Sequence, residues 1–339
     1  MKPAVHADFI TAVGNTPLIR LNWASEQAGA NIYGKAEFMN PGGSVKDRAA
    51  LFMIQDAARR GLIEPGGVLV EATAGNTGIG VALVGNSLGY RSVIVIPETQ
   101  TQEKKDALRA CGALLREVPA VPFSDPNNYV HVAARMAEQI GGYFCNQFDN
   151  TANRDGHIET TGPEIWNSLD GQVDAFTTSV GTGGTLAGVA IALKERNEDI
   201  QIVAADPGGS VIYDFVKTGE LTAEGTSITE GIGQGRITEN LKDAPIDDAE
   251  RIFDPEALDV IYNTILHDGL VMGGSTGINI ASAIRVGRKL GPDANVVTIL
   301  CDSGSRYQSK IFNPEFLRSK DLPVPPWMDD SLVSTEIPS

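Results

Sequence analysis

Lys46, in the stretch Pro41-Gly42-Gly43-Ser44-Val45-Lys46, is the first candidate for chemistry in this sequence. The glycines predict a turn, Ser44 is a candidate N-cap, and the following residues predict an amphipathic helix over 45–60. Lys46 would then lie in the first helical turn, where unsatisfied N–H groups and the helix dipole disfavour an ammonium ion. We expect its pKa to be lowered, which favours nucleophilic or Schiff-base chemistry. A solvated lysine at a helix end is the ordinary alternative.

A glycine-rich loop, residues 179–185 (Ser-Val-Gly-Thr-Gly-Gly-Thr), separates a predicted strand from a predicted helix. Glycines let the backbone approach a ligand closely, and the N–H groups at a helix N-terminus attract an anion. A simple strand-to-helix turn is the alternative. The dinucleotide pattern G-x-G-x-x-G fails because Leu186 occupies its third glycine position, and no Gly-Lys pair fits a Walker loop. The loop therefore predicts a site for a single phosphate.

A polar loop, residues 73–77 (Thr-Ala-Gly-Asn-Thr), follows another predicted strand and opens another predicted helix. Its hydroxyl and amide groups, with the helix N-terminus behind them, could hold a carboxylate. An Asn or Thr helix cap is the common alternative for such a loop.

Ser275 lies in a Gly-Gly-Ser-Thr-Gly stretch that matches the G-x-S-x-G nucleophile elbow of α/β hydrolases. The usual hydrolase triad needs a histidine after the serine, but the last histidine in the chain, His267, precedes it. We therefore expect Ser275 to cap a helix or to offer its hydroxyl to a ring nitrogen of a bound cofactor. A serine hydrolase remains an alternative.

The elements that must position these loops alternate between β-branched runs and helical stretches. Strands are expected over 67–72, 92–96, 113–118, 173–179, 201–205 and 295–301, and helices over 77–88, 101–111 and 127–140, from 185 and from 275. Such alternation predicts an α/β fold with two units of mostly parallel sheet and crossover helices, joined near residues 143–156. Ligands of these folds lie beyond the carboxyl ends of the strands, so we expect the site in a cleft between the units.

Composition excludes several other classes. The chain has 339 residues, 42% of them hydrophobic, and a formal net charge of −16 without a Lys/Arg cluster, which argues against nucleic-acid binding. It has no apolar run of about 18 residues and no leader pattern at residues 1–10, so we expect a cytoplasmic protein. Cys111, Cys145 and Cys301 are expected to be free buried thiols, and no metal site is expected from the scattered histidines.

Taken in order, these motifs resemble those of the fold-type II pyridoxal phosphate enzymes, with a tryptophan synthase β-like fold, and most closely the cysteine synthase (O-acetylserine sulfhydrylase) family. The resemblance runs from Gly14-Asn15-Thr16-Pro17-Leu18 to residues 302–307 and includes 40–48, 75–78, 147–150, 160–166 and 231–233. It implies two three-layer α/β domains with pyridoxal 5'-phosphate in the cleft. The implied reaction is β-replacement, in which O-acetyl-L-serine and sulfide give L-cysteine and acetate through an α-aminoacrylate intermediate.

Carried over residue by residue, the resemblance implies that Lys46 forms the Schiff base with the cofactor and acts as general base. Asn76 would contact the phenolic oxygen and Ser275 the ring nitrogen, and the phosphate would be held by Gly181, Thr182, Gly183, Gly184 and Thr185. The substrate would be bound by Thr73, Ala74, Gly75, Asn76, Thr77, Gln147 and Gly231. A serine instead of an aspartate at the ring nitrogen leaves the pyridine less protonated, which favours β-elimination.

The same resemblance implies a larger cofactor-anchoring domain (1–45 and 151–320), a smaller mobile domain (46–150) and an extended C-terminal tail (321–339). It also implies a homodimer whose active site could receive the C-terminus of serine acetyltransferase. No nucleic-acid or membrane partner is expected.

Three positions depart from the family pattern and leave alternatives open. Ala74 replaces a serine, residues 151–153 lack an expected proline, and Gly231-Ile232-Gly233-Gln234-Gly235-Arg236 is more polar than usual, which suits a polar or charged acceptor. Cystathionine β-synthase, or another β-replacement enzyme using phosphoserine or a different nucleophile, is therefore the main alternative. A non-catalytic small-molecule-binding protein is another.

Overall fold

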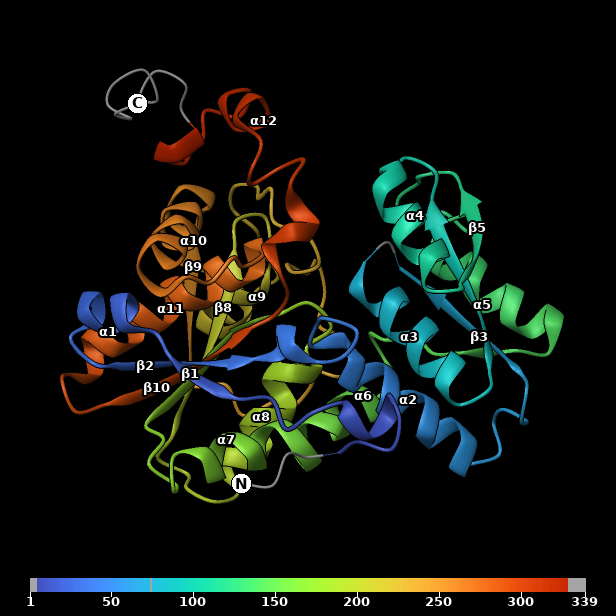
Figure 1. Ribbon diagram of the computed structural model, residues 1–339, viewed down its shortest axis with the longest axis horizontal. Helices are drawn as coiled ribbons and strands as arrows, with labels where there is room; N and C mark the ends of the chain where they lie inside the picture. The colour runs from blue at the N-terminus through green and yellow to red at the C-terminus, as the bar shows by residue number, and fades with distance from the viewer. Residues whose placement is uncertain (1–4, 74, 329–339) are drawn as a thin grey trace.

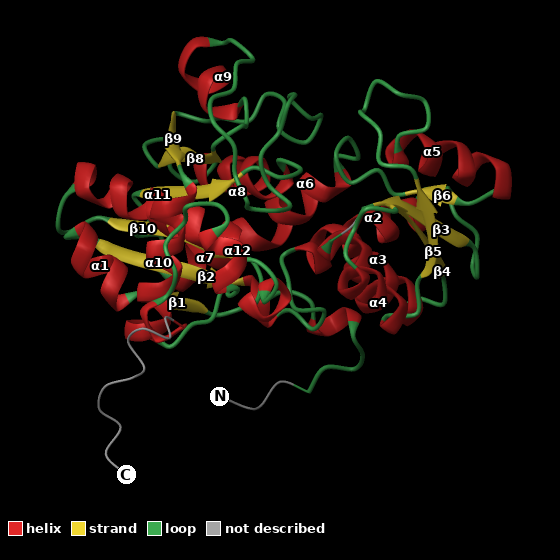
Figure 2. Cartoon of the chain, turned by 90° about the horizontal axis from the view of Figure 1, so that it is seen from above, coloured by secondary structure: helices red, strands yellow, loops and turns green. Residues whose placement is uncertain are grey.

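Two β-sheets organise the computed structural model, which describes residues 5–73 and 75–328 (Figure 1). The larger sheet has the strand order β1-β2-β10-β7-β8-β9 and the smaller sheet the order β5-β4-β3-β6. Neighbouring strands are parallel except β1 and β2, which pair antiparallel. Figure 2 shows the two sheets with helices around each. The expected α/β class with mostly parallel sheets is confirmed.

The smaller sheet lies between two helical layers. Its strands are β3 (Val68–Ala72), β4 (Arg91–Pro97), β5 (Leu114–Val118) and β6 (Tyr143–Phe144), and its helices are α2 (Lys46–Arg59), α3 (Asn76–Ser87), α4 (Gln102–Ala110) and α5 (Tyr129–Ile140). Side chains alternate between the faces of a strand, so Leu69 packs with α2, α3 and α4, whereas its neighbour Val70 packs with α5.

The larger sheet has the same three-layer construction. Its strands are β1 (Leu18–Arg20), β2 (Asn31–Ala36), β7 (Ala175–Ser179), β8 (Gln201–Pro207), β9 (Asp248–Ile252) and β10 (Asn295–Leu300). One face is covered by α1 (Asn22–Ala28), α10 (Asp254–Asp268) and α11 (Gly274–Leu290), and the other by α7 (Gly162–Ser168), α8 (Gly184–Lys194) and α9 (Ile212–Thr218). On β10, Val296 faces the first layer and Val297 the second.

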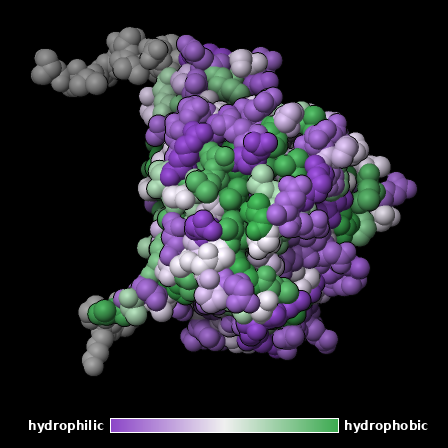
Figure 3. Space-filling model, turned by 90° about the vertical axis from the view of Figure 1, so that its right-hand side faces the viewer, coloured by the Kyte–Doolittle hydropathy of each residue, from purple (hydrophilic) through white to green (hydrophobic). Residues whose placement is uncertain are grey.

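Shorter helices complete the described chain. They are α6 (Ala152–Gly156), α12 (Pro314–Arg318), a π turn (His157–Thr161) and 3₁₀ turns at Ile10–Ala12, Glu37–Met39, Gly304–Tyr307 and Pro326–Met328. No helix within residues 5–73 and 75–328 is long and apolar enough to cross a membrane. The side of the molecule that carries the smaller sheet is largely hydrophilic, with apolar patches among the polar side chains (Figure 3).

All the expected strands are present, with ends shifted by no more than two residues, but the sequence did not predict β1, β2, β6 and β9. The sequence did not predict strand β2 because Gly34 and Lys35 interrupt its apolar pattern. Gly34 is needed there because a Cβ would collide with Leu300 on β10, and the buried Lys35 ammonium pairs with Glu164 at 2.6 Å. A glycine and a buried ion pair thus replace the apolar residues that usually mark a central strand.

The C-terminal tail differs from the extended arm expected over 321–339. Its first part ends in the 3₁₀ turn Pro326–Met328, and the Trp327 ring lies 5.8 Å from the Tyr262 ring on α10, measured between centroids. The rest of the predicted tail, from 329 onward, lies outside the described residues.

Candidate active site

A cavity of about 560 Å³ is lined by loops that follow strands of both sheets. These loops lie at the carboxyl ends of β3, β7 and β10, as expected for parallel α/β folds. The predicted site residues that line this cavity are Lys46, Thr73, Gly75, Asn76, Thr77, Gln147, Gly181, Thr182, Gly183, Thr185, Gly231 and Ser275. Gly184 does not line it, because it packs directly against the Asn153 side chain. Ala74 lies outside the described residues.

Lys46 is the first residue of α2, as the sequence predicts, but its environment differs from the prediction. The N-cap position is Val45 rather than Ser44, although the Ser44 hydroxyl still accepts the Lys46 N–H at 3.2 Å. Burial is the main cause that lowers the pKa of the Lys46 amine, whereas Cys301 and Asp302 act in the opposite direction. In the described part of the chain, no hydrogen bond or ion pair engages this amine. The amine is therefore available to a ligand in the cavity.

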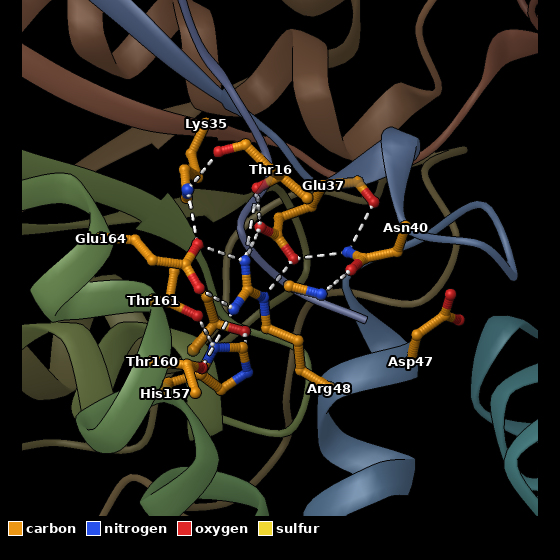
Figure 4. A network of polar contacts seen from close by, with 12 residues as sticks. Thr16, Lys35, Glu37, Asn40, Asp47, Arg48, His157, Thr160, Thr161 and Glu164 are labelled. Atoms are coloured by element: carbon orange, nitrogen blue, oxygen red, sulfur yellow. Dashed lines mark hydrogen bonds and ion pairs between the residues drawn. The ribbon is translucent and has the colours of Figure 1, made fainter. Parts of the chain in front are cut away.

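A buried network of charges fixes the helix that carries Lys46 (Figure 4). The Arg48 guanidinium binds both oxygens of Glu37, each at 2.8 Å, and both oxygens of Glu164, at 2.8 and 2.7 Å. Lys35 adds a second cation, 2.6 Å from Glu164. The two cations and two carboxylates balance, so α2 is tied to β2 and α7 without a net buried charge.

The glycine-rich loop lies at the N-terminus of α8 and lines the cavity. Gly183 has φ +87°, and a Cβ at Gly181 would collide with the Gly231 carbonyl. Two buried side chains outside the loop orient its threonines: Asn153 donates to Thr182 Oγ1 at 2.9 Å, and His157 Nε2 lies 3.2 Å from Thr185 Oγ1.

The sequence did not predict that His157 would contact the glycine-rich loop. Burial, with a contribution from Arg48, lowers its pKa to about 3, so the ring is neutral near pH 7. Its imidazole can then share a hydrogen bond with Thr185 without adding a charge next to the loop.

The loop that follows β3 is braced by Gln147. Thr77 donates to Gln147 Oε1 at 2.6 Å, and the Gln147 amide nitrogen donates to Glu71 Oε1 at 3.3 Å. Glu71 also accepts the backbone N–H groups of Ala72 at 3.0 Å and Gln147 at 3.3 Å. Through Gln147, Glu71 therefore braces the two segments that are predicted to bind the substrate carboxylate together.

Glu71 gives a prediction on pH. Despite its donors, burial raises the pKa of Glu71 to about 8 from an ordinary 4.5. Between these values the unfolded state loses this proton and the folded state keeps it, so stability falls as pH rises. Chemical denaturation of Glu71→Gln and the unmodified protein should give similar stabilities near pH 5. Toward pH 8 the unmodified protein should lose up to about 1.4 kcal/mol per pH unit relative to the variant. Parallel stability curves would contradict this role.

Ser275 lies in the first turn of α11, one residue past the start of the helix, so the expectation that it caps the helix is wrong: the N-cap is Gly273. Its hydroxyl is hydrogen-bonded with the Cys301 side chain, which also lines the cavity. Burial raises the pKa of Cys301 to about 11, so this residue is a neutral thiol near pH 7. Cys301 is only partly buried, unlike the fully buried thiol that was expected.

The polar loop 231–236 does not present a free charge to the cavity. Arg236 binds both carboxylate oxygens of Asp149, at 2.9 and 2.8 Å, and is not among the residues that line the cavity. The Arg236 guanidinium is therefore not available to a charged acceptor, because it is already paired with Asp149.

The cavity suits the cofactor that the sequence resemblance implies. The glycine-rich loop of residues 181–185 offers backbone and hydroxyl donors to a phosphate. Lys46 offers a nucleophilic amine to an aldehyde, and Ser275 and Asn76 offer neutral hydrogen-bonding groups to the ring. The residues present thus match each polar part of pyridoxal phosphate.

Comparisons with known proteins agree with this geometry. A family model described as "Pyridoxal-phosphate dependent enzyme" matches residues 10–302. Cysteine synthase 1 of Emericella nidulans is 52% identical over 317 residues, covering 92% of this chain and 86% of the relative. Cysteine synthase 1 of Neurospora crassa is also 52% identical, with 92% and 84% covered. The crystal structure of an O-ureido-L-serine synthase superposes with a TM-score of 0.84 at 33% identity, covering 92% of this chain and 96% of that one.

Proposed function

This chain belongs to the pyridoxal-phosphate dependent enzyme family, and from that premise we propose that it makes L-cysteine and acetate from O-acetyl-L-serine and sulfide. The relatives at 52% identity, which both bear the name cysteine synthase, support this β-replacement reaction over others of the family. Cystathionine beta-synthase of Mus musculus is more distant, at 37% identity.

The observation that carries the proposal is the Lys46 amine, which no described residue engages, in a cavity that the glycine-rich loop at the N-terminus of α8 also lines. A lysine whose burial lowers its pKa can bind an aldehyde covalently and can later exchange a proton. Neither ability is needed in a protein that only binds a small molecule. The same geometry does not support a serine hydrolase, since Ser275 contacts the Cys301 thiol rather than a base.

When bound, pyridoxal phosphate supplies an electron sink that weakens the bonds around the α-carbon of an attached amino acid. Lys46 would hold the cofactor, be released when the substrate binds, and then use its Nζ to take the proton from the α-carbon. Acetate leaves from the β-carbon, and sulfide takes its place. Lys46 returns the proton to the α-carbon before cysteine is released.

The other groups bind and orient. Gly181, Thr182, Gly183 and Thr185 would hold the phosphate directly, and Gly184 supports that loop from behind. Thr73, Gly75, Thr77, Gln147 and Gly231 would surround the substrate, with its carboxylate on the loop after β3. Asn76 and Ser275 would contact the ring. The buried position of the Gln147–Thr77 pair supports a rigid carboxylate site.

We extend the proposal to the organisation of the protein. Residues 46–150 would form the smaller, mobile domain, and residues 1–45 and 151–320 the larger domain that anchors the cofactor. The enzyme would act as a cytoplasmic homodimer. Its carboxylate site would also suit the C-terminus of serine acetyltransferase, because a peptide terminus carries the same carboxylate group as the substrate.

The leaving group can be tested directly. O-acetylserine, O-phosphoserine and serine are added separately to the cofactor-loaded enzyme, and the visible spectrum and the released acetate or phosphate are followed. We expect O-acetylserine alone to change the spectrum rapidly, with release of one acetate per active site, and to yield cysteine when sulfide is added.

Homocysteine in place of sulfide serves as the control for the nucleophile. Cystathionine formation faster than cysteine formation, or a response to phosphoserine alone, would replace the proposed substrates while leaving the family assignment intact. No response to any of the three amino acids would remove the β-replacement proposal itself.

A further inference from the structure

Asp302 is a buried carboxylate, next in sequence to the cavity-lining residue Cys301, to which the mechanism above gives no role. It comes two residues after the end of β10 and is 1% exposed. Its Oδ2 atom accepts a hydrogen bond from Asn76 Nδ2 at 2.6 Å and another from the Tyr307 hydroxyl at 2.7 Å. Its Oδ1 atom is buried without a partner in the described part of the molecule. An ionisable group is rarely buried in this way without a function.

The other end of the Asn76 amide is also occupied. Arg306 donates through Nη1 to Asn76 Oδ1 and through Nη2 to the Gly42 carbonyl at 2.7 Å. A carboxylate only accepts hydrogen bonds and a guanidinium only donates them, so the amide nitrogen must face Asp302 and the oxygen must face Arg306. The orientation of the Asn76 amide is therefore fixed by its two charged neighbours.

Among residues 5–73 and 75–328, this arrangement leaves one Asn76 N–H without a protein partner. An amide nitrogen has two N–H groups, of which Asp302 takes one, and Asn76 lines the cavity. A flipped amide would instead present its carbonyl oxygen, which would repel an anionic oxygen of a ligand. The orientation of the Asn76 amide thus decides whether Asn76 can donate a hydrogen bond to the cofactor ring.

The contacts also cross between the two sheets. Asn76 begins α3, next to the smaller sheet, whereas Asp302 and Arg306 follow β10 of the larger sheet. Two glycines leave room for the side chains that contact Asn76. A Cβ at Gly273 would collide with Asp302 Oδ1, and a Cβ at Gly43 would lie 2.7 Å from Arg306 Nη2. The amide is therefore oriented only while the two walls of the cavity are together.

From this geometry we infer that Asp302 and Arg306 are positioning residues that hold the Asn76 amide with its free N–H toward the phenolic oxygen of the cofactor. The inference rests on the proposed function, since it assigns a purpose to the Asn76 contact. Burial raises the pKa of Asp302, while Tyr307, Asn76, Arg306 and Lys46 oppose that rise. The charged and titratable groups that face it are Lys46 from α2 and Cys301, Arg306 and Tyr307 from its own segment after β10.

The test compares Asp302→Asn with the unmodified enzyme, both loaded with pyridoxal phosphate. Asparagine has the size of aspartate but can turn its own amide toward Asn76, which allows Asn76 to flip. Without substrate, the apparent pKa of the cofactor's visible absorbance band should shift by roughly one unit. The reason is that the ionisable phenolic oxygen loses the hydrogen bond that Asn76 donates to it. kcat should fall by roughly 10- to 100-fold, the effect of one lost hydrogen bond to a charged group. KM should change little, because Thr77 and Gln147 are untouched.

Two further variants separate positioning from a structural role. Ser303→Ala removes the cap of the adjacent 3₁₀ turn, where Ser303 accepts the Ser305 N–H, and should leave both readouts unchanged. The double variant Asn76→Ala/Asp302→Asn should have the same kcat and the same band titration as Asn76→Ala alone, because Asp302 acts through Asn76.

The inference is overturned if Asp302→Asn titrates like the unmodified enzyme, if the two substitutions are additive, or if Ser303→Ala reproduces the shift. These outcomes differ from a failure of the proposed function. In that case the unmodified enzyme would itself show no visible band with pyridoxal phosphate or no reaction with O-acetylserine.

Discussion

Replacement of Lys46 by alanine is expected to abolish turnover and to remove the visible absorbance that the covalently held cofactor contributes. The variant loses both the amine that binds the aldehyde and the base that exchanges the α-proton. General acid–base catalysis alone accounts for about 10²- to 10⁴-fold in rate, so the combined loss should exceed about 10⁴-fold. Absorbance spectroscopy and a cysteine-formation assay measure the two effects independently.

The fold itself should tolerate this change. Lys46 makes no side-chain hydrogen bond or ion pair within the described residues. Its removal enlarges the ligand cavity that it lines and leaves no hole in the hydrophobic core. Circular dichroism and thermal unfolding should therefore resemble those of the unmodified protein. Small primary amines added to the variant should restore part of the activity by entering the enlarged cavity. A Lys46→Ala variant that keeps the band or the turnover would sink the assignment of Lys46.

The largest effect on stability is expected from Arg48→Met. Methionine fills a similar volume but leaves Glu37 and Glu164 with Lys35 as their remaining cation (Figure 4). Burial disfavours the Glu37 carboxylate, but Arg48, together with Thr16 and Lys35, outweighs this effect and lowers the pKa of Glu37 to about 2. Removing one partner from a buried ion pair leaves an uncompensated buried charge, so the unfolding free energy should fall by about 3–5 kcal/mol. Urea denaturation near pH 7 measures the loss.

Two matched variants test the cause. Arg59→Met lies on the same helix, but its side chain is 77% exposed, so its pairing with Asp56 should contribute less than about 1 kcal/mol. Glu37→Gln placed in the Arg48→Met background removes the excess buried charge and should recover part of the lost stability. If the double variant is less stable than Arg48→Met, charge imbalance is not the reason for the loss.

The sequence predicted most of the candidate site because its motifs are local. Lys46, the 73–77 loop and the 179–185 loop each stand at the junction of a strand or turn with a helix, where glycine and capping residues mark the backbone conformation. Their shared position beyond the strand ends then follows from the parallel α/β pattern. The sequence alone therefore predicts that a reactive lysine, an anion-binding loop and a carboxylate-binding loop lie around one cavity.

The residues that orient this site could not be predicted in the same way. Asp302 contacts Asn76, and His157 contacts Thr185, although each pair is far apart in sequence. Asp302 belongs to the 302–307 stretch that carries the resemblance, but nothing in that stretch predicts a contact with Asn76. Arg48 looks like an ordinary helix residue until β2 and α7 bring carboxylates to it. Such contacts depend on which elements pack together.

Lys46 illustrates the division between the two levels. The sequence by itself determined the position of the lysine in the first turn of a helix and the presence of a glycine-rich anion site elsewhere in the chain. Only the tertiary structure decided that burial lowers the pKa of the amine, and that Asp302 and Arg306 orient the Asn76 amide. Helix starts and glycine turns are set by neighbours in sequence, whereas desolvation and the pairing of buried charges are set by neighbours in space.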